Sequence, residues 1–257
     1  TITLTGPVVI SGDVEIDTNT SGTDGTLTFT STIRGTDNTA NTSSKLELDT
    51  GTGAISFHAA NTIIGGASKP LDTLSINTSD SDEALTIPQI GSGTTTAGVL
   101  GEVVIGNTSG TPSISMQDEL YNFGTGNVSI NSAGTTTFSK TDNVGVNLAG
   151  GNIAINSNVT ITGGAAADKD TLDINSGGGN ITITGNIAGS DGDEVLILDD
   201  AGAGSGGGGG ALDVGWTGPG AGQISTTGSV AIGTELIHHG DTDTKIAFGD
   251  DAIGFTV

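Results

Sequence analysis

The chain of 257 residues contains no cysteine, which excludes disulfide bonds and thiolate metal sites. Aromatic residues make up only 3% of it, with one Trp and one Tyr, so few rings are present to stack against sugars. No apolar run reaches the roughly 18 residues that a membrane-spanning helix requires, and we therefore expect no membrane insertion. The absence of cysteine suits a secreted protein, because such a chain avoids unwanted cross-links.

Positive charge is also scarce, because six Lys and Arg residues stand against 29 Asp and Glu residues. The formal net charge is −23 at pH 7. Phosphate groups are bound by positive charge, so this balance argues against a nucleic-acid partner and disfavours anionic membrane surfaces. It favours cations as partners and solubility at high salt.

No window of the sequence shows a helical period, and the 45 glycines argue against helices. The abundant residues are Thr, Ser and Asn, with β-branched residues on alternate positions. The segment 150–164, GGNIAINSNVTITGG, shows this pattern between glycines. Alternation with a period of two is typical of half-buried strands, so the sequence predicts an all-β protein.

A glycine followed by apolar residues at the second and fourth positions recurs along the chain. The repeat glycines are Gly12, Gly25, Gly53, Gly101, Gly126, Gly151, Gly179 and Gly228. The steps from Gly101 to Gly126 and from Gly126 to Gly151 are equal, and the step from Gly151 to Gly179 is slightly longer. Segment 46–77 also aligns without a gap on segment 144–175, about four steps further along the chain. A period of this length is typical of a solenoid.

The repeats predict a parallel β-helix, or β-solenoid, of about ten coils with roughly 25 residues per coil. A single coil cannot bury its inward Ile and Val side chains, whereas stacked coils can. We expect one solenoid domain over residues 1–257, with the Gly-rich segment 201–210 as an exposed loop. Asn127, Asn152 and Asn180 share one repeat position, where we expect their amides to stack.

Residues 50–77, 99–116 and 150–164 carry a resemblance to a known family. In rhythm and composition the chain resembles the right-handed parallel β-helix repeats of giant bacterial adhesins of the filamentous-haemagglutinin type, on and off through residues 8–200. The resemblance implies an extracellular surface rod or fibre without an active site.

Acidic residues with Asp-x-Asp spacing make calcium a candidate ligand. Calcium takes about six to eight oxygen ligands, and Asp191, Asp193 and Glu194 form the best candidate site. Further pairs are Asp80/Asp82, Asp168/Asp170 and Asp241/Asp243. None has the spacing of an EF-hand or the glycine-rich nonapeptide of calcium-binding β-rolls. The alternative interpretation is a set of solvated turns that keep the rod soluble.

The fold class and the residue composition suggest two other functions, an enzyme and an ice-binding protein. Parallel β-helices include polysaccharide hydrolases, which need two carboxylates that the abundant Asp residues could supply, and polysaccharide lyases. A lyase for acidic sugars usually needs cationic side chains, whereas Arg34 is the only arginine. Because few aromatic rings are present to stack against sugars, we expect no enzyme activity. Recurring Thr-x-Thr pairs make ice binding a second candidate function, which requires threonines in register from coil to coil. Thr182 lies close after its repeat glycine, Gly179, whereas Thr160 lies much further from its own, Gly151, so the sequence predicts no such ladder.

Strand-like segments lie near both ends, TITLT at residues 1–5 and AIGFTV at residues 252–257. Neither is a capping helix, and unpaired terminal coils invite further strands. The leading hypothesis is a secreted structural protein of the cell surface, a subunit that pairs with itself through these segments into a head-to-tail filament. The alternative is a segment of a large adhesin stalk that binds glycans or host or partner surfaces.

Overall fold

The protein is built from β-strands in the computed structural model. The structure describes the whole chain except residues 20–23, 37–43, 59–61, 67–68, 78–82, 93–95, 141–145, 150, 164–170, 178, 190–194, 200–211, 215–234, 238–244, 250–251 and 257. No helix occurs among the described residues. The prediction of an all-β protein is therefore confirmed.

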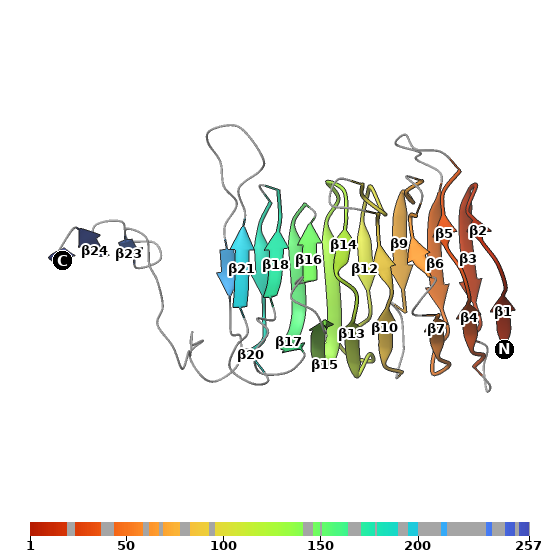
Figure 1. Ribbon diagram of the computed structural model, residues 1–257. Coiled ribbons are helices and arrows are strands. Elements are labelled where there is room, and N and C mark those ends of the chain that lie inside the picture. Colours follow the sequence, from red (N-terminus) through yellow and green to blue (C-terminus); the bar gives the residue numbers. More distant parts are fainter. Residues whose placement is uncertain are drawn as a thin grey trace. The chain divides into compact units, whose positions relative to one another are not determined.

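The first face of the solenoid is a parallel sheet in which strands from successive coils lie side by side (Figure 1). Its path runs through β3 (Asp13–Asp17), β6 (Lys45–Asp49), β9 (Thr73–Ile76), β12 (Val103–Ile105), β15 (Val128–Lys140), β17 (Ile153–Gly163), β19 (Ile181–Ile183) and β22 (Leu212–Val214). Every pairing along this path is parallel.

Two further faces complete each coil. The second face is the parallel sheet of β2 (Val8–Val9), β5 (Ile33–Arg34), β8 (Ile63–Ile64), β11 (Gln89–Ile90), β14 (Leu120–Asn122), β16 (Val146–Ala149), β18 (Thr171–Asn175) and β21 (Val195–Asp199). The third face comprises β1 (Ile2–Leu4), β4 (Leu27–Phe29) and β7 (Ile55–Phe57), and then β10 (Leu85–Ile87), β13 (Ser113–Met116), the second halves of β15 and β17, and β20 (Ile187–Gly189).

The predicted β-solenoid is confirmed, but the expectation of about ten coils exceeds what the described residues show, because the first face stacks eight strands. The reason is the length of the coils. Val103 pairs with Val128, which is the step between Gly101 and Gly126 and agrees with the repeat. Asp13 pairs with Lys45, which is a longer step. Longer coils use up residues that a uniform repeat would have assigned to further coils, and residues 235–256 include antiparallel strands instead.

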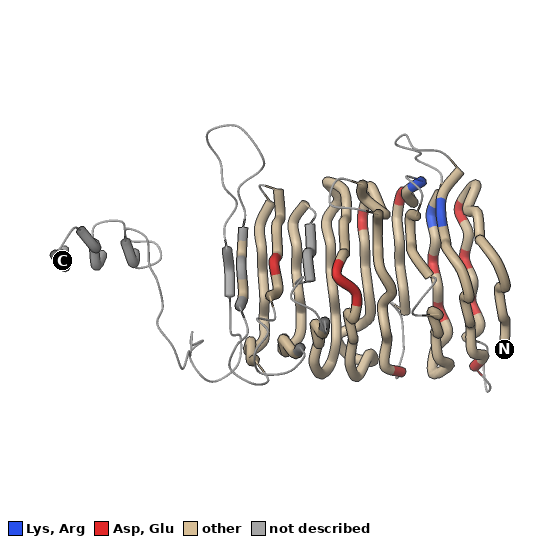
Figure 2. Tube along the Cα trace, viewed as in Figure 1, with Lys and Arg blue, Asp and Glu red and all other residues tan. Residues whose placement is uncertain are grey.

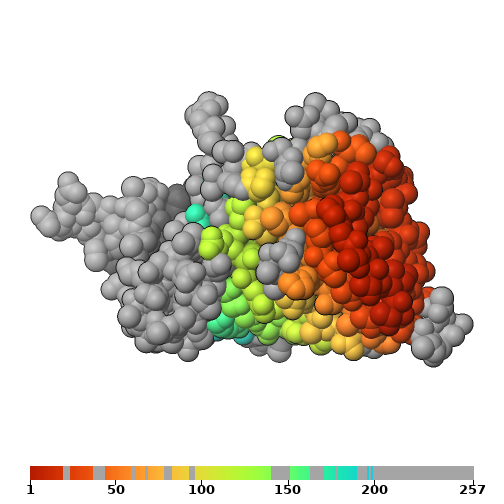
Figure 3. All heavy atoms as spheres, turned by 45° about the vertical axis from the view of Figure 1, so that its right-hand side comes forward, coloured from red at the N-terminus to blue at the C-terminus, as the bar shows by residue number. Residues whose placement is uncertain are grey.

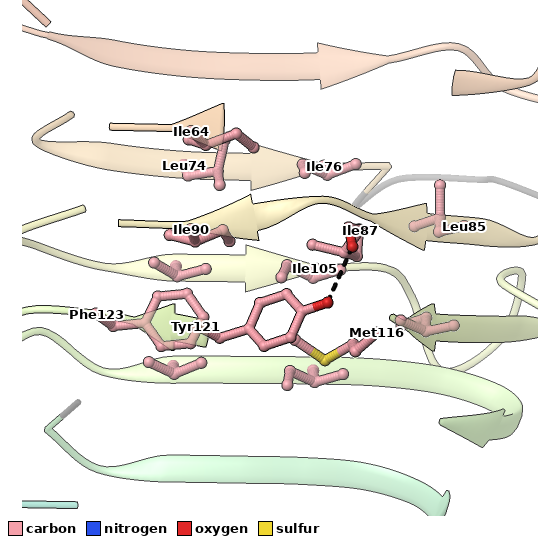
Figure 4. Packing of buried hydrophobic residues seen from close by; sticks show 14 of the residues in the cluster. Ile64, Leu74, Ile76, Leu85, Ile87, Ile90, Ile105, Met116, Tyr121 and Phe123 are labelled. Carbon is pink, nitrogen blue, oxygen red and sulfur yellow. Dashed lines mark hydrogen bonds between the residues drawn. The ribbon is translucent and has the colours of Figure 1, made fainter. Parts of the chain in front are cut away.

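Apolar side chains form continuous columns inside the solenoid (Figure 4). The two columns of the first face are Val14, Leu46, Leu74, Val103, Val128, Ile153 and Ile181, and Ile16, Leu48, Ile76, Ile105, Ile130, Ile155 and Ile183. From the second coil onward each of these side chains is at most 1% exposed. Each fully enclosed side chain contributes roughly 1.5–3 kcal/mol to folding, which only stacking of coils makes possible.

Among the described residues Tyr121 is the largest fully buried side chain, and its hydroxyl is paired inside the column (Figure 4). The hydroxyl donates to the carbonyl oxygen of Ile87 at 3.1 Å and accepts the N–H of Asp118 at 3.0 Å. Burial raises the pKa of the Tyr121 hydroxyl far above its usual range. The phenol therefore acts as a neutral structural link between neighbouring coils rather than as an acid or base.

The repeat glycines allow adjacent coils to approach closely. A Cβ on Gly126 would lie 2.0 Å from the carbonyl oxygen of Gly101, and a Cβ on Gly151 would lie 2.5 Å from that of Thr125. Such contacts are far inside van der Waals distance. In these coils the backbones approach too closely for a side chain, whereas Ser44 and Asp72 occupy the same register position in two earlier coils.

The predicted stacking of asparagine amides is confirmed for Asn127 and Asn152, and Asn180 joins them through its backbone. The Asn152 side-chain amide donates to the amide oxygen of Asn127 at 2.8 Å. The Asn152 amide oxygen in turn accepts the backbone N–H of Asn180 at 2.8 Å. These bonds tie three successive coils together at one turn of the solenoid.

By its contacts the chain divides into two compact units, Thr1–Gly222 and Gln223–Val257. In the second unit β23 (Glu235–Ile237), β24 (Lys245–Gly249) and β25 (Ala252–Thr256) pair antiparallel, unlike the parallel coils of the first. The boundaries of the expected single domain over residues 1–257 stay a prediction. The expected loop at 201–210 lies outside the described residues.

Substitution of Gly126 by Ala is expected to destabilise the folded chain by about 1–3 kcal/mol, because the added methyl group overpacks a backbone contact. Gly12→Ala is the matched control, since Gly12 holds the same repeat position and has no atom within 4 Å of its would-be Cβ. Its effect is expected to stay within about 0.5 kcal/mol. Urea denaturation followed by circular dichroism measures both. Equal losses of stability in the two variants would contradict the close-approach argument.

Candidate functional site

The first coil ends in three strands that each have a strand neighbour on one side only. Among the described residues β1 pairs with β4, β2 pairs with β5 and β3 pairs with β6, and each of the three is the last strand of its path. We call these three strands the open edge. A strand edge of this kind is a template for pairing with another strand.

Along the open edge, alternate backbone N–H groups point toward the second coil and away from it. Ile2 donates its N–H to Thr26 of the second coil at 2.8 Å, and Val8 donates to Thr32 at 2.9 Å. In a parallel strand successive N–H groups point to opposite sides. The N–H groups of Thr3 and Val9 therefore face the side on which a further coil would lie.

The apolar core is uncovered at the open edge, which Figure 3 turns toward the reader. Ile2 is 40% exposed, although the next member of its column, Leu27, is 0% exposed. Four more inward side chains of the first coil are only partly buried, namely Leu4, Val8, Val14 and Ile16. The columns are thus closed by coils on one side and open on the other.

The repeat glycine of the first coil gives independent support. Nothing lies within 4 Å of a Cβ built on Gly12, whereas the equivalent glycine in a later coil, Gly126, meets the backbone of the coil before it. The space in front of Gly12 is therefore the space that a preceding coil would fill.

Carboxylates line the outer surface of β3 and of β6 beside it (Figure 2). In register, Glu15 of β3 lies beside Glu47 of β6. The register also places Asp17 beside Asp49. Like charges directly opposite one another are destabilising. This part of the surface therefore repels other anions.

One ion pair relieves this repulsion in part. The ammonium group of Lys45 lies 3.8 Å from the carboxylate of Asp13, and the two side chains are 48% and 71% exposed. Exposed pairs of this kind contribute little, typically about 0–1 kcal/mol. The surface around the open edge remains acidic.

The remaining acidic groups near this end hold turns in place. The Asp24 carboxylate accepts the backbone N–H and the hydroxyl of Thr52, and these two bonds hold the pKa of Asp24 below its usual value. The Asp17 carboxylate accepts the N–H of Asn19 at 2.6 Å. These carboxylates stabilise loops between coils, and no chemistry follows from their arrangement.

The calcium hypothesis is not tested by the described part of the chain. Asp191, Asp193 and Glu194 lie outside it, as do Asp80/Asp82, Asp168/Asp170 and Asp241/Asp243. Among the described residues no group of three or more His, Asp or Glu side chains is arranged to hold a metal ion. The candidate calcium site at residues 191–194 stays a prediction.

The predicted pairing segments adopt strands of different kinds. Residues 1–5 contain β1, which lies at the open edge and pairs parallel with β4. Residues 252–257 contain β25, which pairs antiparallel with β24. Only the first segment is therefore part of a parallel coil.

Sequence reasoning found the open edge but missed the acidic column beside it. The signal was present in the segments DVEID at 13–17 and KLELD at 45–49, where charged and apolar residues alternate. What was missing was the register that brings Glu15 beside Glu47. That register spans a longer step than the repeat of the later coils.

Comparisons with protein-family models, with curated proteins and with solved structures gave no match. The described residues contain no helical segment with the length and apolarity needed to cross a bilayer. Inference about function therefore starts from the geometry of the solenoid itself.

Replacement of Glu47 by Gln is expected to raise the stability of the first unit by about 0.2–1 kcal/mol at low salt, because it removes a like-charge neighbour of Glu15. The gain should shrink at high salt, which screens exposed charges. Glu102→Gln is the matched control, since its backbone carbonyl pairs with Leu74 and Glu102 lies beside no carboxylate in register. Thermal melts at two salt concentrations check this. A gain that is equal for both variants or independent of salt would argue against repulsion within the column.

Proposed function

We propose that this chain is a structural extracellular protein, a subunit of a head-to-tail surface filament built by stacking β-solenoids. The observation that supports the proposal is the open edge, where backbone groups, apolar columns and the space before Gly12 all fit a further coil. The occupant is a second copy of this chain.

Stacking a further coil removes two costs at once. It encloses the exposed Ile2 and the partly buried Val14 and Ile16, which are open to water in the first coil. It also pairs the outward N–H groups of β1 and β2. Strand addition at an exposed sheet edge is a general mode of association, in which main-chain bonds supply affinity and side-chain columns supply register.

Composition supports an extracellular structural role over an enzymatic one. The chain carries no cysteine and has a single arginine and a net charge of −23, so its outer surface is acidic. The resemblance to adhesin repeats points in the same direction. The second candidate, a segment of an adhesin stalk that recognises glycans, is favoured by the same resemblance. In that case preceding coils of a longer chain would occupy the open edge.

The variant Ile2→Lys is expected to weaken self-association at least about tenfold, which corresponds to about 1.4 kcal/mol, because it places a charge where the apolar column should continue. Thr3→Lys is the matched control. Thr3 lies on the same strand and in the outward column with Thr28. A lysine at this position therefore adds the same charge without entering the core. Sedimentation velocity over a range of concentrations measures the association, and negative-stain microscopy shows its form.

A wild-type chain that stays monomeric at every concentration would overturn the filament proposal and favour the stalk segment. Equal loss of association in both lysine variants would show that the open column does not control it.

Self-association is also expected to increase with salt concentration. The edge that must be approached carries Asp13, Glu15 and Asp17, and the approaching copy is itself strongly anionic. The screening length falls from about 30 Å at 0.01 M to about 8 Å at 0.15 M salt, so repulsion between copies weakens over this range. Light scattering in a salt titration measures the effect. Glu15→Gln should reduce the salt dependence more than Glu102→Gln does, and association that falls with added salt would contradict the repulsion argument.

A further inference from the structure

The third face of the solenoid presents a regular array of hydroxyl groups on β10, β13, β15 and β17. We call this array the hydroxyl face. Its outward positions are Thr86, Ser113, Ser115, Thr135, Thr137, Ser139, Asn158, Thr160 and Thr162. All but the amide of Asn158 carry a hydroxyl. These positions alternate with buried residues along each strand.

The hydroxyl groups are in register from coil to coil. The central column is Thr86, Ser115, Thr137 and Thr160. The flanking columns are Ser113, Thr135 and Asn158, and Ser139 and Thr162. The sequence-based prediction that threonines form no ladder is therefore wrong for this face. The prediction is correct for Thr160 and Thr182, the pair on which it was based, because Thr182 lies in another column, beside Ala154.

The layer beneath the hydroxyl face is fully packed. Phe138, Val159 and Ile161 are between 1% and 4% exposed. Thr136 is buried as well, and its hydroxyl is hydrogen-bonded to that of Ser157 at 2.7 Å. The β-branched threonines above this layer have few rotamers to choose from. The strands that carry the outward hydroxyl groups are thus fixed by the packed layer beneath them.

The hydroxyl face is also free of charge. None of its outward positions is Asp, Glu, Lys or Arg, although the chain contains 29 acidic residues. On the first face, by contrast, the outward column contains the adjacent carboxylates of Glu15 and Glu47. A neutral surface with fixed hydroxyl groups favours a partner that is itself uncharged, ordered and built from hydrogen-bonding groups.

We propose that the hydroxyl face binds the ordered water lattice of ice. Strands of a sheet lie about 4.8 Å apart, and alternate residues on one strand repeat at about 6.6 Å. These two distances are close to the repeats of oxygen positions on the prism face of hexagonal ice. At the threonine positions a methyl group lies beside the hydroxyl, whereas Ser113, Ser115 and Ser139 carry the hydroxyl alone. Because the array is already fixed, little conformational entropy is lost when it binds.

This inference does not depend on the filament proposal, since the hydroxyl face and the open edge lie on different strands. The test uses the full chain at concentrations at which it is dispersed. Thermal hysteresis and the shape of single ice crystals are measured by nanolitre osmometry, and uptake into growing ice is measured by ice-affinity partition. We expect the wild-type chain to shape ice crystals and to enter the ice.

The double variant Thr137→Lys with Thr160→Lys should lose both activities, because two long cationic side chains interrupt the central column. The matched control is Ser129→Lys with Thr182→Lys, which adds the same charge at outward positions of the first face and should retain both activities. Circular dichroism and melting temperature establish that each variant is folded. Exclusion of the wild-type chain from ice, or an equal loss in the control, would overturn the inference.

Discussion

Each coil of this protein depends on a neighbouring coil for the enclosure of its core. Leu46 is 1% exposed because it lies between Val14 and Leu74 in a continuous column. Val14 has a coil on one side only and is partly buried. Stability in such a structure is approximately a sum of contacts between adjacent coils. In the first coil, which has a described neighbour on one side only, the core is therefore incompletely enclosed.

Residues that act between equivalent positions of successive coils were predictable from the sequence. Glycine must stand at Gly126 because its would-be Cβ meets the backbone of the previous coil, and the same need recurs at Gly151. Asn127 and Asn152 are linked for the same reason, since identical residues at identical positions lie one above the other. Where the repeat is regular, position in the sequence is equivalent to position in space.

The number of coils and the hydroxyl columns were not predictable in this way. Thr137 lies further along the chain from Gly126 than Thr160 lies from Gly151, so counting from the repeat glycines separates them. The structure brings them into register because β15 and β17 shift relative to each other between Asn131 and Thr135. Extra residues at a corner of a coil change the number of residues per coil without changing how the strands stack. A sequence pattern alone does not show at which corner the extra residues lie.

Outward side chains at equivalent positions of successive coils lie in columns, so the residue type at one repeat position determines the chemistry of a whole face. Backbone hydrogen bonds fix the spacing between strands, so side chains in a column cannot relax by moving apart. Beside the open edge this constraint holds Glu15 against Glu47 and makes the surface repulsive. Along Thr137 and Thr160 the same constraint carries no electrostatic cost and yields an ordered neutral array. One backbone geometry thus gives an acidic surface on β3 and β6 and a neutral hydroxyl surface on β15 and β17, and only the outward residue types distinguish them.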